Sequence, residues 1–251
     1  MNTVEIIAGI ITLIPMLIGY GMAILSIIKY FQKKNHLLIL SAIIFFSLVS
    51  SWIGVTIVFL AAVFNLPPPN DQLYLFSYSW AVPVLATTWN FVTASLFKKK
   101  QYLKYIVLGI MVVLDILFIV FIYVLGKYTV ETLEGLIYKD STFLSPASYI
   151  LYAYVASVLL FICPVYFWVS YRSEQRIIKF KSLMIGIGSA LFAIVAVLDG
   201  AIPLGNITVV IIIRFVLTIA LVLLFLGYNT PNFIVNKLEP PVATDTMSDT
   251  G

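Results

Sequence analysis

Three charged residues interrupt long apolar stretches of the sequence, and they are the residues best placed to do chemistry. They are Asp115, Asp199 and Arg214. A charged side chain at the centre of a bilayer costs about 2.5–3.5 kcal/mol on insertion scales, so such residues usually face other protein segments and have a partner. A carboxyl group in apolar surroundings can carry a proton or bind a cation, and an arginine can bind an anionic or carbonyl group.

The apolar stretches that contain these charges indicate an integral membrane protein. Of the 251 residues, 62% are apolar and 10% are charged, and the mean hydropathy is +1.07. Soluble domains are about 45–50% apolar and about 25% charged. A helix needs roughly 20 apolar residues to cross a bilayer. We therefore predict an all-α bundle of seven transmembrane helices within residues 1–228, near 4–28, 37–65, 74–97, 105–126, 147–170, 182–203 and 207–227. Residues 229–251 are expected to form a short, polar, disordered cytoplasmic tail.

The basic residues predict how the bundle is oriented. Eleven of the fifteen Lys and Arg residues lie in three short loops that alternate with loops nearly free of basic charge: Lys29, Lys33 and Lys34; Lys98, Lys99, Lys100 and Lys104; Arg172, Arg176, Lys179 and Lys181. The opposite loops carry only Lys127 and Lys139. Because basic loops remain in the cytoplasm, we expect a multi-pass protein of the cell membrane with its N-terminus outside and its C-terminus inside. The basic charge then faces the lipid bilayer, and no nucleic-acid partner is expected.

Asp115 lies near the midplane by residue count, because it is eleven residues from Lys104 and twelve from Lys127. Its neighbours along the helix are apolar, so its partner must come from another helix. Segment 74–97 carries a small and polar stripe at helical spacing, with Thr87 at the depth of Asp115 and Asn90 one turn away. Two interpretations stay open: a buried carboxyl hydrogen-bonded to Thr87, Thr88 or Asn90, or a polar or proton site.

Asp199 and Arg214 lie in the outer halves of two helices that a short turn connects. We predict an ion pair, because antiparallel neighbours bring these side chains together and arginine has a long reach. The pair is either a structural cross-link or a ligand site in which Arg214 binds the ligand. Trp52, Trp80 and Tyr152 fall at a similar depth and are candidates for its wall. The alternative is an interfacial aromatic belt, to which Tyr149 and Tyr154 would also belong.

Several function classes lack the residues that they need. Segment 207–227 contains no lysine, so a retinal Schiff base at the usual place is excluded and no cofactor is expected. Cys163 and His36 are the single cysteine and histidine, so no metal site is expected. The end of segment seven, GYNTPNF, lacks the Asn-Pro-x-x-Tyr pattern of G-protein-coupled receptors. No hydrolase, protease or nucleotide-binding motif occurs, so we do not expect an enzyme.

The stretch from Ser79 to Arg172, followed by YRSEQRIIKFKSLMIGIGSALFAIVAVLDG at 171–200, resembles the N-terminal seven-helix sensor region of membrane histidine kinases. The shared pattern is a basic inner loop that leads into a glycine-containing sixth helix ending near an aspartate, and it covers about half of the chain. The resemblance implies a sensor. Those proteins continue into kinase domains, whereas this sequence continues into a short polar tail.

The leading hypothesis is therefore a stand-alone sensor or receptor-like protein. It would bind a small molecule or sense the membrane, and it would signal through a separate cytoplasmic or membrane partner. The main alternative is a small-solute, ion or proton transporter or channel that uses Asp115. A third alternative is a structural subunit that co-purifies with a membrane partner.

Overall fold

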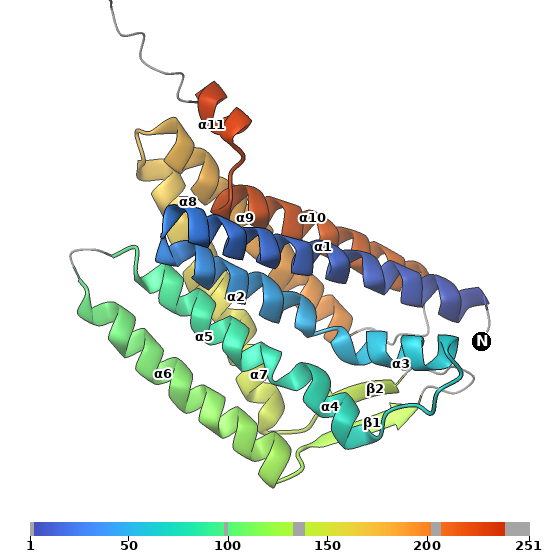
Figure 1. Cartoon of the computed structure of the whole chain (residues 1–251). Helices are drawn as coiled ribbons and strands as arrows, with labels where there is room; N and C mark the ends of the chain where they lie inside the picture. Colours follow the sequence, from blue (N-terminus) through green and yellow to red (C-terminus); the bar gives the residue numbers. More distant parts are fainter. Residues whose placement is uncertain (1–2, 98–99, 133–138, 202–206, 239–251) are drawn as a thin grey trace, which may run out of the picture.

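The apolar stretches fold into helices that lie side by side in one bundle (Figure 1). The computed structural model describes residues 3–97, 100–132, 139–201 and 207–238. Lys98 and Lys99 of the second basic loop therefore lie outside the described residues.

The first helix, α1 (Thr3–Lys33), runs the full length of the bundle and packs against α2 and α10. Close approach to α2 depends on Gly19, because a methyl group there would lie 2.1 Å from Cγ1 of Val49. After α1 the backbone turns at Lys34, which adopts the left-handed conformation (φ 52°). The side chain of Asn35 then accepts a hydrogen bond from the backbone of Leu37 and caps the next helix.

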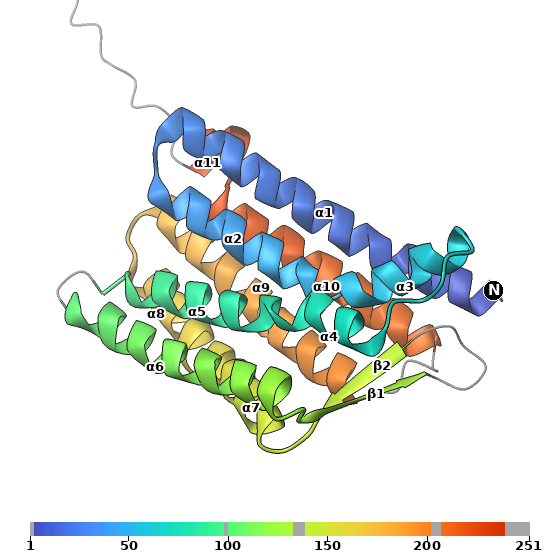
Figure 2. The same ribbon diagram turned by 60° about the horizontal axis from the view of Figure 1, so that its bottom comes forward.

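That next helix is broken. α2 (His36–Ser50) and α3 (Ile53–Val63) meet at an angle of 54°, with Ser51 and Trp52 at the break. The hydroxyl of Ser50 donates a hydrogen bond to the Phe46 carbonyl 2.7 Å away in the preceding turn. Serine hydroxyls that bond back in this way bend helices. The break turns α3 away from the axis of α2 (Figure 2).

The third predicted segment is also divided, into α4 (Asp71–Ser79) and α5 (Ala81–Ala94). Pro83 explains the interruption at Trp80, because proline has no N–H and its ring clashes with the carbonyl of the residue four positions earlier, Ser79. α5 packs between α2 and α6. Its central position brings both of its faces into contact with the rest of the bundle.

The next helix, α6 (Tyr102–Ile119), continues as a π-helical turn, η1 (Val120–Val124), and lies at the edge of the bundle. It leads into an antiparallel hairpin of β1 (Tyr128–Thr132) and β2 (Lys139–Phe143), in which Tyr128 pairs with Phe143 and Val130 with Ser141.

The remaining helices begin with α7 (Ala147–Ser157), which continues through a π-helical turn, η2 (Val158–Ile162), into α8 (Cys163–Arg172). Pro164 in the first turn of α8 again removes a backbone donor, and the wider turn precedes it. α9 (Arg176–Ala201) then packs against α8 and α10 (Ile207–Tyr228).

A short helix, α11 (Asn232–Leu238), follows α10 and contacts α9. The sequence predicts a disordered tail from residue 229, and the structure differs here: Asn229 is buried and 232–238 is helical. Pro231 starts this helix, because its carbonyl accepts hydrogen bonds from Ile234 and Val235. Residues 239–251 of the predicted tail lie outside the described residues.

Among the described residues, five helices are long and apolar enough to cross a membrane, and a sixth is added if α2 and α3 are counted as one bent span. The chain is therefore an all-α protein of the membrane class, as predicted. Each of the seven predicted segments coincides with a helix or a broken helix whose ends differ from the prediction by at most six residues. The third predicted segment, the α4–α5 pair, is not among the long apolar helices.

The largest apolar cluster lies where α2, α5, α9 and α10 meet. Trp89 of this cluster and Arg214 are the largest fully buried side chains among the described residues. A fully buried arginine is unusual, because charged groups are rarely fully buried unless they are paired. The polar partners of Arg214 therefore locate the first candidate site.

Candidate functional site

Arg214 and Asp199 form the ion pair that the sequence predicts. Nη1 of Arg214 lies 3.0 Å from both carboxylate oxygens of Asp199. The two residues come from neighbouring helices, because Asp199 is near the end of α9 and Arg214 lies two turns into α10. The Arg214 side chain is 1% exposed and that of Asp199 is 20% exposed. The carboxylate therefore lies toward the surface and the guanidinium toward the core.

Trp52 completes this cluster from a third element. Its indole nitrogen donates a hydrogen bond of 2.6 Å to Oδ2 of Asp199. The guanidinium carbon of Arg214 lies 5.2 Å from the centre of the Trp52 ring, within the range of a cation–π interaction. Trp52 occupies the break between α2 and α3. The break therefore positions an aromatic donor against the ion pair.

One donor of this cluster remains available. The Nε atom of Arg214 is buried and has no hydrogen-bond partner among the described residues. A buried donor without a partner costs about 1–3 kcal/mol, so an acceptor that reached it would gain binding energy. Asp199 therefore contacts Nη1 of Arg214, while the buried Nε keeps an unused hydrogen-bond donor among the described residues. This is an arrangement that can bind a small acceptor group such as a carboxylate or carbonyl.

Aromatic side chains extend the cluster into the core. Trp52 contacts the ring of Phe192 edge to face at 6.4 Å, and Phe192 contacts Trp89 at 5.7 Å. Trp89 belongs to α5 and is completely buried. A continuous line of rings therefore connects the ion pair on α9 and α10 with the central helix α5.

Asp115 forms a second polar cluster, with partners on two other helices. Thr87 Oγ1 donates a hydrogen bond of 2.5 Å to Oδ2, and the Tyr154 hydroxyl donates one of 2.7 Å to Oδ1. Thr87 is on α5 and Tyr154 on α7, so the carboxyl group cross-links both to α6. The contact with Thr87 is one of the partners that the sequence predicts. Asp115 is half-buried, and Tyr154 is buried.

Asn90 belongs to the same polar layer but bonds elsewhere. Its amide nitrogen donates to the Ala86 carbonyl at 2.8 Å and to Ser157 Oγ at 2.9 Å. The Ser157 hydroxyl in turn donates to the Tyr154 carbonyl at 2.7 Å. Asn90 therefore adds a link between α5 and the end of α7, one turn from Thr87.

The structure does not bring Trp80 and Tyr152 to the Arg214 cluster. The indole nitrogen of Trp80 donates to the Ser77 carbonyl of its own helix pair at 3.1 Å, and its ring contacts Phe46 at 6.0 Å. Tyr152 is 64% exposed, so its side chain is at the surface of α7. Of the aromatic residues predicted for the outer site, only Trp52 contacts the ion pair.

A third polar cluster, at the other end of the bundle, was not anticipated. Lys29 Nζ donates to the Asn229 carbonyl at 2.9 Å and lies 5.6 Å from the centre of the Phe225 ring. The Asn229 amide nitrogen donates to Ser26 Oγ at 2.7 Å. These contacts fasten α1 to the end of α10. The sequence signal was an asparagine directly after an apolar segment, which also marks an ordinary helix end.

Within the described residues, no three His, Cys, Asp or Glu side chains come together as a metal site would require. Comparison with protein-family models, with curated proteins and with solved structures finds no match for this chain.

Proposed function

We propose that this chain is a stand-alone seven-transmembrane sensor or receptor-like protein of the cell membrane. It would bind a small ligand through the cluster of Arg214, Asp199 and Trp52 and signal through a separate partner. The observation that carries the proposal is the buried guanidinium of Arg214, which keeps an unpartnered Nε beside a carboxylate and a tryptophan. The resemblance to histidine-kinase sensor regions favours the same function.

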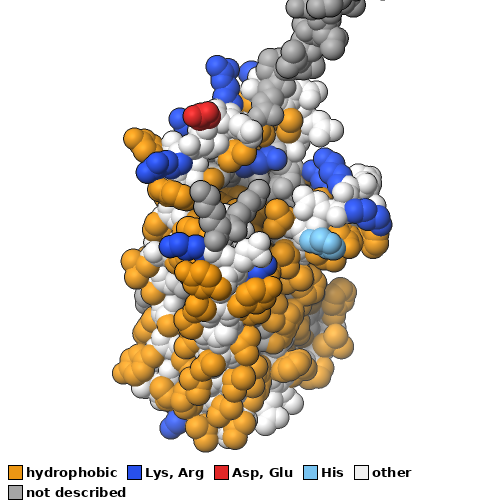
Figure 3. Space-filling model, turned by 90° about the vertical axis from the view of Figure 1, so that its left-hand side faces the viewer, with side chains coloured by type: hydrophobic (Ala, Val, Ile, Leu, Met, Phe, Trp, Pro, Cys, Tyr) orange, Lys and Arg blue, Asp and Glu red, His pale blue; other side chains and the backbone are white. Residues whose placement is uncertain are grey.

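The proposed membrane topology has seven passes, with the N-terminus outside and the C-terminus inside. The passes are α1, α2–α3, α4–α5, α6–η1, α7–η2–α8, α9 and α10. It is supported by the connections after α1, α5 and α8, which lie at one end of the bundle, whereas the hairpin and the start of α1 lie at the other (Figure 1). Lys and Arg side chains are spread over the first end (Figure 3). By the positive-inside rule that end faces the cytoplasm.

In this topology the candidate ligand cluster is in the outer half and the Lys29–Asn229 cluster is at the inner end. A ligand that bound Arg214 would compete with or add to the contact of Asp199. It would thereby change the free energy of the bend at Trp52 and favour one helix arrangement over another. The basic inner end and α11 are the surfaces through which a cytoplasmic partner would detect the change.

The proposal is tested by ligand-dependent thermal stabilisation of the purified protein. Small carboxylates and phosphates are screened, together with molecules that mass spectrometry finds retained after gentle purification. We expect an acidic compound to raise the Tm of the wild-type protein and to have no effect on Arg214→Gln. Trp80→Phe is the matched control and should keep the shift. An equal shift in Arg214→Gln would overturn the proposed site.

A second candidate function, a small-solute or proton transporter or channel, is favoured by the carboxyl group of Asp115. A carboxyl that accepts hydrogen bonds from Thr87 and Tyr154 between three helices is a candidate proton or cation site. Transport predicts proton or solute flux in proteoliposomes that disappears in Asp115→Asn. Absence of flux, together with the ligand-dependent shift, would favour the sensor.

A further inference from the structure

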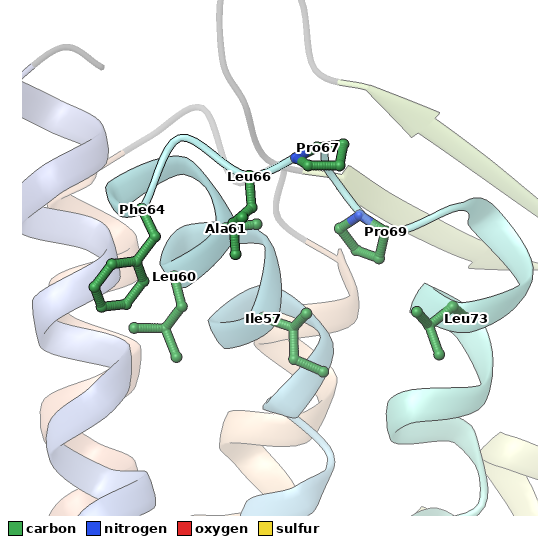
Figure 4. Close-up of a pocket in the computed structure, with 8 residues that line it drawn as sticks. All are labelled: Ile57, Leu60, Ala61, Phe64, Leu66, Pro67, Pro69 and Leu73. Carbon is green, nitrogen blue, oxygen red and sulfur yellow. The ribbon is translucent and has the colours of Figure 1, made fainter.

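A cavity of about 300 Å³ lies between α3 and α4 (Figure 4). Both helices lie at the end of the bundle away from the connections after α1 and α8 (Figure 1). One wall is the stripe of Ile57, Leu60, Ala61 and Phe64 on α3, which recurs at helical spacing. Leu73 at the start of α4 faces this stripe across the cavity. The cavity therefore lies between α4 and the helix that the bend at Trp52 turns away from the axis of α2.

The packing of α3 explains why the cavity exists. Near its start, α3 approaches α4 closely, because a methyl group at Gly54 would lie 3.0 Å from Ser77 Oγ and from the ring of Tyr74. Further along, Val58 and Phe59 of α3 still pack in one buried cluster with Tyr74 of α4. Leu66, Pro67 and Pro69 of the connecting loop close the far end. The cavity is thus a wedge fixed by a glycine contact at one side and a proline-containing loop at the other.

The lining selects the chemistry of an occupant. All eight lining residues are apolar, and no charged or hydroxyl-bearing side chain is among them. The lining side chains offer water no hydrogen-bond partners, so an apolar group that displaces water from the cavity gains binding free energy. The lining also offers no counter-charge for a free acid or amine. A helix, about 10–12 Å in diameter with its side chains, is too wide for this volume.

The cavity is continuous with the apolar surface of the bundle. At its rim Phe64 is 67% exposed and Leu73 is 53% exposed. Phe76, one turn further along α4, is 58% exposed. The surroundings of such a surface in a membrane protein are lipid chains, and these exposed apolar side chains adjoin the cavity.

We infer that the wedge between α3 and α4 is a binding site for one acyl chain of a bilayer phospholipid. A single hydrocarbon chain matches its volume, its purely apolar lining and its opening toward the lipid-facing surface. This site is separate from the Arg214 cluster and does not depend on the proposed sensor function. Lipid binding can be lost while the ligand-dependent shift in Tm is kept, and the reverse also holds.

The test is photo-crosslinking in phosphatidylcholine nanodiscs that contain a small fraction of phosphatidylcholine with a diazirine on its acyl chain. After irradiation, mass spectrometry compares labelling per residue in 57–73 with labelling in α6 (Tyr102–Ile119), whose exposed face contacts ordinary lipid. We expect about fivefold more labelling in 57–73, which corresponds to about 1 kcal/mol of preference. Equal labelling of the two segments would overturn the inference.

Ala61→Phe fills the wedge from α3, and Ala153→Phe is the matched control, because Ala153 is on an exposed part of α7. Labelling of 57–73 should fall to the level of α6 in the first variant and stay unchanged in the second. Ile57→Phe replaces Ala61→Phe if the latter does not yield monodisperse protein. Undiminished labelling in a folded filled variant would also overturn the inference.

A second arm distinguishes the source of the chain. A free fatty acid with a diazirine is added to nanodiscs of unlabelled phosphatidylcholine. Labelling of 57–73 by the free acid, without labelling by the phospholipid, would mean that the occupant is a single-chain ligand and would overturn the assignment to a bilayer lipid.

Discussion

Trp52 and Asp199 are 147 positions apart in the sequence and are joined by a hydrogen bond of 2.6 Å between indole nitrogen and carboxylate. The same carboxylate pairs with Arg214. Trp52 occupies the break between α2 and α3. Its hydrogen bond therefore links the bend between these helices to the ion pair on α9 and α10.

Substitution of Asp199 should lower the free energy of unfolding more than substitution of Arg214. Asp199→Asn leaves the guanidinium of Arg214, which is 1% exposed, without a counter-charge, and should cost about 3–5 kcal/mol. Arg214→Gln leaves a carboxylate that is 20% exposed and still bonded to Trp52, and should cost about 1–3 kcal/mol. Equilibrium unfolding in mixed detergent micelles measures both. The opposite order would contradict the assigned burial of the pair.

Trp52→Phe should lose the hydrogen bond to Asp199 and keep most of the ring contact with Phe192. We expect a loss of about 1–2 kcal/mol in the free energy of unfolding, because a bond to a charged group is removed. Trp80→Phe is the control. Its indole bonds to a carbonyl of its own helix pair, so a smaller loss is expected. Equal losses would mean that the hydrogen bond from Trp52 to Asp199 stabilises the fold no more than the hydrogen bond from Trp80 to the Ser77 carbonyl.

Asp115 should tolerate an isosteric change better than an apolar one. Asparagine can still accept one hydroxyl hydrogen bond and donate to the other hydroxyl, so Asp115→Asn should change stability by less than about 1 kcal/mol. Asp115→Leu leaves the hydroxyls of Thr87 and Tyr154 without their acceptor and should cost about 1–3 kcal/mol. Thermal unfolding in detergent compares the two variants. A larger loss in the asparagine variant would show that the negative charge itself is required for stability.

Gly19 and Gly21 of α1 allow a controlled test of how closely α1 packs on α2, because only Gly19 faces α2. Gly19→Ala would place a methyl group 2.1 Å from the stiff side chain of Val49, so the helices must separate, at a cost of about 1–3 kcal/mol. A methyl group at Gly21 meets nothing within 4 Å, so Gly21→Ala should be neutral or stabilise the helix by up to about 1 kcal/mol. Destabilisation by both changes to the same extent would contradict the packing of α1 on α2.

Lys29→Met should loosen the end of α10. It removes the hydrogen bond to the Asn229 carbonyl and the charge beside Phe225, while the apolar part of the side chain is kept. Hydrogen exchange of residues 226–238 should accelerate, and exchange in α5 should not change. Lys33→Met is the control, because Lys33 is exposed at the last turn of α1. Unchanged hydrogen exchange in 226–238 would mean that the contacts of Lys29 do not stabilise the end of α10.

The sequence was sufficient for the helices and for two of their contacts. Apolar length located each helix or broken helix, because the free energy of burying a helix in lipid depends on composition summed over roughly twenty residues. The Asp199–Arg214 pair followed from a short connection between antiparallel helices, and the Thr87–Asp115 contact followed from equal depth. Both arguments use only distances along helices, which are fixed by the helical rise.

The helix breaks and the other side-chain contacts of the polar clusters depend on specific hydrogen bonds, which cannot be predicted from hydropathy. A bend of 54° at Ser51 and Trp52 arises from hydroxyls that compete for backbone carbonyls, and serines occur in straight helices as well. The sequence predicts Tyr154 as part of an aromatic group at the outer end of its helix. Its bond to Asp115 depends on the angle between α6 and α7, which no count along one helix can supply.

Helix α5 carries Trp89 and Asn90 as consecutive residues, and successive residues of a helix point about 100° apart. The first contacts Phe192 on the side of the ion pair, and the second bonds Ser157 beside the Asp115 cluster. Rotation of α5 about its own axis would therefore disturb both neighbourhoods together. Substitutions made on the two sides of this helix should be thermodynamically coupled, so that their effects on stability fail to add although no atoms of the two clusters touch.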